Sequence, residues 1–96
     1  MRSTNENKLL TIYLEGEINS SNAEEVEKEI DEIFSQGGFN EIKLDLSKLT
    51  YISSAGLRVI VRLIQNFKNT SIINVPDDIY DIFEMVGFTR IFTIKK

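Results

Sequence analysis

The stretch LDLSKLTYISSAGLRVIV, residues 44–61, changes from strand-like to helix-like periodicity. Leu44 and Leu46 alternate with polar neighbours, which is the two-residue repeat of a half-buried strand. From Ser54 onward, apolar residues recur three and four positions apart, which indicates an amphipathic helix. Two serines, Ser53 and Ser54, stand at the junction, although one hydroxyl suffices to cap a helix. The second serine is therefore a candidate functional group.

The rest of the chain alternates between predicted strands and predicted helices. Strands are expected at 8–16, 41–47, 71–75 and 90–94, and helices at 18–38, 54–68 and 76–88. Ser21 and Glu24 fit a capping box at the start of the first helix, and Gly37 with Gly38 predicts its end. The order β, α, β, α, β, α, β predicts an α/β fold with a mostly parallel mixed central sheet and helices packed against it.

Length and composition bound the architecture. The chain has 96 residues, of which 42% are hydrophobic, so residues 1–96 are expected to form a single domain with one core. No segment approaches the roughly 18 apolar residues needed to span a bilayer, and no apolar leader follows the first methionine. We therefore expect a cytoplasmic protein with no membrane contact; the absence of cysteine agrees with a reducing compartment.

Missing residue types exclude several chemistries. With no histidine and no cysteine, the chain can form neither a Ser-His-Asp or Cys-His nucleophile nor an ordinary zinc site. The acidic residues at 24–32 are spread around a helix and lack the loop geometry of a calcium site. We therefore expect no metal, no cofactor and no catalysis.

The net charge is −4, which argues against nucleic acid as a direct partner because such binding relies on neutralising phosphates. The charge is unevenly distributed. Residues 43–68 carry five basic side chains and one acidic one, a net +4, so the remainder sums to −8. The middle of the chain is thus electrostatically distinct, and Arg58 and Arg62 within it are either ordinary surface charges or partner contacts.

Two interpretations of the serine pair remain open on residue chemistry alone. One serine can be the N-cap of the following helix. Alternatively, an exposed hydroxyl at a helix N-terminus is a suitable phosphorylation site, because the free N–H groups and the helix dipole stabilise an anion there. Arg58 lies one turn after Ser54, and Gly56 suits a position where another backbone or a ligand approaches closely.

At these residues the sequence resembles STAS domains, and specifically the bacterial anti-sigma factor antagonists. The segment LDLSKLTYISSAGLRVI resembles the family's strand, loop and serine-bearing helix start. Two further segments, LEGEINSSNAEEVEKEI and IYDIFEMVGFTRIFTI, are similar to the family's early segment and to its closing helix and strand. Ser53 and Asn19 stand at positions where the family often has aspartate. The resemblance covers nearly the whole chain.

The resemblance implies partner switching. In this family the unmodified protein binds a GHKL-type serine kinase that is also an anti-sigma factor, which frees sigma; the kinase phosphorylates the serine, and a PP2C-type phosphatase restores it. By position the phosphoacceptor is Ser54, with Ser53 as the alternative. The partner-binding face then comprises Asn19, Ser20, Ser21, Ser53, Ser54, Gly56, Leu57 and Arg58.

A second interpretation belongs to a different functional class. STAS domains also occur in anion transporters and lipid-transport complexes, so the chain could be a constitutive scaffold or an accessory subunit. Neighbouring genes distinguish the two: a GHKL kinase or PP2C phosphatase favours the switch, and permease subunits favour the scaffold.

Overall fold

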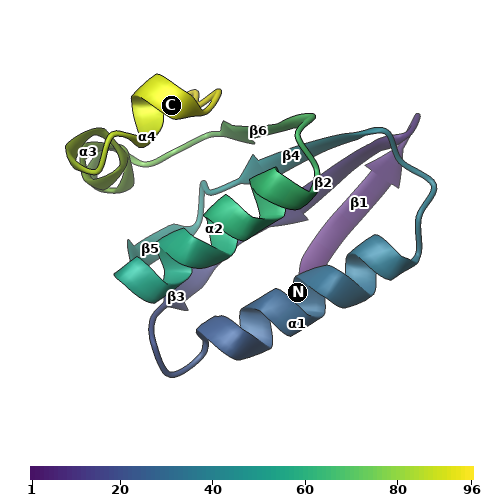
Figure 1. Ribbon diagram of the computed structural model, residues 1–96, viewed down its shortest axis with the longest axis horizontal. Helices are drawn as coiled ribbons and strands as arrows, with labels where there is room; N and C mark the ends of the chain where they lie inside the picture. Colours follow the sequence, from purple (N-terminus) through teal and green to yellow (C-terminus); the bar gives the residue numbers. More distant parts are fainter.

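The computed structural model describes residues 1–96 and contains six strands and four helices (Figure 1). The strands are β1 (Arg2–Glu6), β2 (Leu9–Tyr13), β3 (Gly16–Ile18), β4 (Glu41–Asp45), β5 (Leu49–Ile52) and β6 (Thr70–Ile73). The helices are α1 (Ala23–Ser35), α2 (Ser54–Asn66), α3 (Asp77–Met85) and α4 (Phe88–Ile91).

The strands form two sheets. The larger one has the order β1-β2-β4-β6, in which β1 is antiparallel to β2 and the other neighbours are parallel. The smaller one is a parallel pair of β3 and β5. The predicted α/β class with a mostly parallel mixed sheet is therefore confirmed. The parallel neighbours are joined through α1 and α2, which lie side by side in front of the larger sheet (Figure 1).

A single hydrophobic cluster of 20 buried residues connects the sheets and helices. Alternate residues of β2 and β4, including Ile12, Ile42 and Leu44, are completely buried, as the two-residue repeat requires. The phenylalanines pack on this core in two groups. Phe34, Phe39 and Phe67 form one, and Phe83, Phe88 and Phe92 form the other. The six phenylalanines therefore serve in packing.

The buried face of α2 contains Gly56, Val59, Ile60, Leu63 and Ile64. This helix was expected from its apolar spacing, and the structure confirms it. Leu57 and Val61 lie beside the buried face and are only half-buried.

Three local predictions are wrong. Residues 90–94 do not form a strand: α4 occupies Phe88–Ile91, and only Ile94 bridges to Ile72. Gly87, with a φ of 83°, ends α3 in the left-handed region, and Phe88 then packs between Phe83 and Phe92. The helical turn of α4 buries the Phe88 ring. Residues 90 and 91 belong to this turn, so a strand cannot begin at 90.

The strands β1, β3 and β5 were missed by the sequence analysis. β1 and β5 are short and partly exposed. β3 lies where the predicted strand 8–16 ended and the predicted helix 18–38 began, so α1 starts later than predicted, at Ala23. The capping box at Ser21 is the third error. The N-cap of α1 is Asn22, with no side-chain capping hydrogen bond, and the Ser21 hydroxyl donates instead to Oδ1 of Asn19.

The carboxylate of Asp45 ties the end of β4 to the turn that follows β6. Its Oδ1 accepts the Ser47 N–H at 2.9 Å, and its Oδ2 accepts the Asn74 side-chain amide at 2.9 Å. Burial by itself raises the pKa of Asp45, but the hydrogen bonds from Ser47 and Asn74, with the charge of Arg2, outweigh burial and hold the pKa below its ordinary value of 3.8. Asp45 and Ser47 therefore stabilise the end of the strand and the turn that follows it.

Replacing Asp45 by asparagine is therefore expected to lower the free energy of unfolding at pH 7 by about 1–3 kcal/mol, because charge-assisted hydrogen bonds are lost. The folded pKa is depressed, so the carboxylate stabilises the fold above the unfolded pKa of about 3.9 and loses this effect as the pH falls through the lower folded pKa. Urea unfolding of wild type and Asp45→Asn from pH 7 to pH 2.5 measures this. A difference that stays constant below pH 4 would contradict the assignment.

None of the helices combines the length and the apolar character that crossing a bilayer demands.

Candidate functional site

The smaller sheet brings the two serine-containing loops together. Ile18 of β3 pairs with Ile52 of β5 in a parallel register, and the N–H of Ser53 donates to the carbonyl oxygen of Ile18 at 2.9 Å. Parallel strands end at the same edge, so Asn19 and Ser53, the residues that directly follow the two strands, lie next to each other. The loop that starts at Asn19 therefore begins next to the start of α2.

Asparagine side chains fix the loop between β3 and α1. The N–H and the hydroxyl of Ser21 both donate to Oδ1 of Asn19, at 3.0 and 2.6 Å. The N–H of Asn19 donates to Oδ1 of Asn22 at 2.8 Å, and the Asn22 amide donates to the carbonyl oxygen of Glu17 at 2.8 Å. Asn22 was missed by the sequence analysis. Asx turns of this kind preorganise a loop, so the exposed Ser20 and Ser21 are held beside α2.

The two serines have different environments. Ser53 is the half-buried N-cap of α2, and its Oγ accepts the N–H of Gly56 at 3.4 Å, a long bond. Ser54 is the first residue of α2, is exposed, and has no hydrogen bond from its hydroxyl to another residue. Ser53 therefore caps the helix, and Ser54 presents a free hydroxyl at the helix N-terminus, where its role as a phosphorylation site stays a prediction.

Gly56 is buried beneath this surface. A Cβ at this position would lie 2.7 Å from Cγ1 of Ile52 and 2.8 Å from Cγ2 of Ile18. The groups that approach Gly56 closely are therefore side chains of the same chain, and the missing Cβ lets α2 pack closely on β3 and β5. Gly56 therefore lies beneath the exposed residues of the proposed partner-binding face, and its part in that face stays a prediction.

Charged residues distinguish the two ends of α2. Arg62 pairs with Glu27 of α1 at 2.9 Å, so it joins the two helices. Arg58 is exposed and takes part in none of the ion pairs within the chain. Arg58 therefore remains available one helical turn after Ser54, on the same side of the helix.

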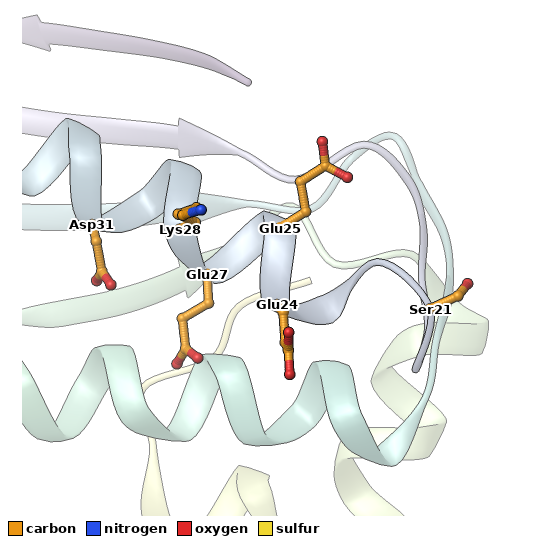
Figure 2. Close-up of a pocket in the computed structure, with 6 residues that line it drawn as sticks. All are labelled: Ser21, Glu24, Glu25, Glu27, Lys28 and Asp31. Carbon is orange, nitrogen blue, oxygen red and sulfur yellow. The ribbon is translucent and has the colours of Figure 1, made fainter.

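An acidic surface of α1 flanks α2. Figure 2 shows Glu24, Glu27 and Asp31 extending from α1 toward α2, while Glu25 extends to the other side. The shallow hollow on this surface of α1 has no apolar lining residue. No group of three or more carboxylates converges there as metal ligands would.

One exposed aromatic residue near the junction escaped the sequence analysis. Tyr51 of β5 is 46% exposed and pairs in register with Glu17. The apolar residues of 49–52 were visible in the sequence, but these residues were interpreted as part of a loop. Tyr51 extends the exposed surface on the strand that leads into Ser53 and Ser54.

Comparison with known proteins gives consistent results. The family model described as the STAS domain matches residues 2–96. BtrV of Bordetella bronchiseptica, whose assignment as an anti-sigma factor antagonist is provisional, is 33% identical over 90 residues, which cover 90% of this chain and 77% of BtrV.

Solved structures show the same fold. The anti-sigma factor antagonist SpoIIAA in its unphosphorylated form has a TM-score of 0.78 at 16% identity, with 99% of this chain and 86% of that chain covered. The phosphorylated form of SpoIIAA from Bacillus has a TM-score of 0.67 at 17% identity, with coverage of 99% and 91%. The STAS domain of a SulP transporter from Vibrio cholerae has a TM-score of 0.68 at 20% identity, with coverage of 99% and 78%. At these identities the likeness concerns the fold alone.

Proposed function

The chain belongs to the STAS domain family, and from this premise we propose that it is an anti-sigma factor antagonist that acts by partner switching. In its unmodified form it binds a GHKL-type serine kinase that is also an anti-sigma factor, and so releases sigma. Phosphorylation of Ser54 ends this binding, and a PP2C-type phosphatase restores it. The chain acts as a binding module without catalysis of its own.

The observation that carries the proposal is the environment of Ser54. Its hydroxyl is exposed at the N-terminus of a 13-residue helix whose first turn contains no acidic side chain. A phosphate there meets the positive end of the helix dipole and free backbone N–H groups, so the modified protein can stay folded. Arg58, one turn further on, adds a second source of positive charge.

The binding face is proposed around the edge where β3 and β5 end. It consists of the exposed or half-buried residues Asn19, Ser20, Ser21, Ser53, Ser54, Leu57 and Arg58, with Gly56 beneath them. The hydrogen bonds of Asn19 and Asn22 hold the loop in one conformation. A preorganised surface binds a partner with a smaller loss of conformational entropy.

Incubation with the cognate kinase and ATP is expected to add one phosphate, at Ser54. The Ser53 hydroxyl is half-buried and already engaged as a cap, so it is the poorer acceptor. Intact-mass spectrometry of wild type, Ser54→Ala and Ser53→Ala tests this: wild type and Ser53→Ala should gain one phosphate, and Ser54→Ala none. Stoichiometric labelling of Ser54→Ala would move the acceptor to Ser53 or elsewhere.

A constitutive scaffold within a transporter is the second candidate, because the fold also matches the STAS domain of a transporter. It requires no modification of Ser54. Failure of both kinase binding and phosphorylation, together with copurification with permease subunits, would favour it.

A further inference from the structure

Exposed apolar side chains are concentrated near the end of the chain. Three of the five large exposed hydrophobic residues, Met85, Val86 and Ile91, lie at the end of α3 and in α4. Met85 is 84% exposed and Ile91 is 71% exposed. The two helices are joined by the stacked rings of Phe83 and Phe88, 5.5 Å apart. Such a cluster on a small protein commonly marks an interaction surface, and the proposed Ser54 face does not include it.

An apolar groove runs between α2 and α4, on one side of this cluster. Its lining consists of Val61, Ile64, Gln65, Lys68, Phe88, Ile91 and Phe92. Five of these seven residues are hydrophobic, and Lys68 is the only charged one. Phe88 and Phe92 meet edge to face at 5.1 Å, so one wall is packed in a fixed arrangement. The groove suits an apolar side chain that is accompanied by negative charge.

The other side of α4 carries the complementary features. Met85 lies there in a hollow that it shares with Asp81, Glu84, Thr89 and Arg90. Met85, which is 84% exposed, therefore has the two carboxylates and the guanidinium of Arg90 near it. Neither carboxylate forms an ion pair within the chain, and neither does Lys68.

We propose that this surface binds a second copy of the chain. Met85 of each copy enters the α2–α4 groove of the other, and Glu84 faces Lys68 across the contact. The projecting side chain and the groove flank the same short helix, so a two-fold axis beside α4 lets both contacts form at once, as in other isologous dimers. A second copy fits this surface because one chain supplies both the apolar projection and the groove, with charges of opposite sign.

Sedimentation velocity over a range of protein concentrations tests the proposal without any kinase. The contact is small, so we expect a weak dimer with a Kd between about 1 µM and 1 mM. Met85→Lys and Ile91→Ser should each raise the Kd at least about tenfold, while Tyr51→Ser, an exposed substitution outside this surface, should leave it unchanged. All three positions are exposed, and thermal melts at low concentration should therefore resemble wild type.

Charge reversal tests the orientation. Glu84→Lys and Lys68→Glu should each weaken the dimer, and the double variant should recover most of the wild-type affinity because the opposite charges are restored. A protein that is monomeric up to about 1 mM, or a dimer insensitive to Met85→Lys, would overturn the proposal. Ser54→Ala should dimerise like wild type, so this result is independent of whether Ser54 is phosphorylated.

Discussion

Protein carrying a phosphate on Ser54 is expected to bind its kinase at least about a hundredfold more weakly than the unmodified protein, a loss of about 2.7 kcal/mol. The phosphate adds about −1.5 to −2 charges at pH 7. It would project from an exposed position, so a docked partner would have to desolvate it or place like charge against it. The fold itself need not change for binding to be lost.

Two substitutions at Ser54 separate charge from the loss of the hydroxyl. Ser54→Asp introduces less charge and bulk than phosphate, so its affinity for the kinase should fall only about tenfold, or about 1.4 kcal/mol. Ser54→Ala should bind like wild type. Ser54→Asp should melt no lower than wild type, because an acidic residue in the first turn of a helix is stabilising.

Titration calorimetry against the kinase measures the affinities of these three proteins and of the phosphoprotein, and thermal melts report on their stability. If the phosphoprotein and Ser54→Asp both bind as tightly as Ser54→Ala, the surface is not gated by phosphate. The constitutive scaffold then becomes the better account.

Substitution of Gly56 is expected to have the largest effect on stability outside the sheet core. An alanine Cβ would lie 2.7 and 2.8 Å from side-chain atoms of Ile52 and Ile18, which is closer than carbon atoms can approach without movement. Alanine ordinarily gains about 1 kcal/mol over glycine within a helix. Here the forced displacement should exceed that gain, and Gly56→Ala should unfold with about 1–3 kcal/mol less free energy than wild type.

A double-mutant cycle tests this cause. Ile18→Ala alone leaves a cavity and is destabilising, but it also removes Cγ2, which would lie 2.8 Å from the new methyl group. The double variant should therefore lose less stability in urea unfolding than the sum of the single losses. Additive losses would show that the close approach to Ile18 is not the reason for glycine. Because α2 begins two residues before Gly56, Gly56→Ala should also weaken kinase binding.

The elements with strong local signals were predictable from the sequence. In β2, β4, α1 and α2 the apolar residues repeat with the period of a strand or of a helix. These two periods follow from the local backbone geometry, so they can be read from each segment alone. Gly37 and Gly38, which both have positive φ, follow the first helix where its end was expected. The family resemblance added the prediction that Ser54 is the phosphoacceptor, because periodicity alone could not distinguish Ser54 from Ser53.

The tertiary structure decided those features that depend on partners distant in the sequence. Residues 2–6 and 49–52 are strands because β2 and β3 supply hydrogen-bonding neighbours, which a short stretch of sequence does not reveal by itself. Ser21 satisfies a capping pattern, yet Asn19 takes its hydroxyl.

The same holds at the end of the chain and at the site. Residues 88–91 are helical because Phe88 packs on Phe83 and Phe92. Gly56 is required by the side chains of Ile18 and Ile52, and Ser53 becomes half-buried when its N–H bonds to Ile18, which leaves Ser54 as the exposed hydroxyl. The sequence by itself determined that a serine pair begins a helix after a buried strand. Only the packing of that helix against β3 and β5 decided which serine caps it and which faces solvent, because burial is a property of contacts between segments and not of any one segment.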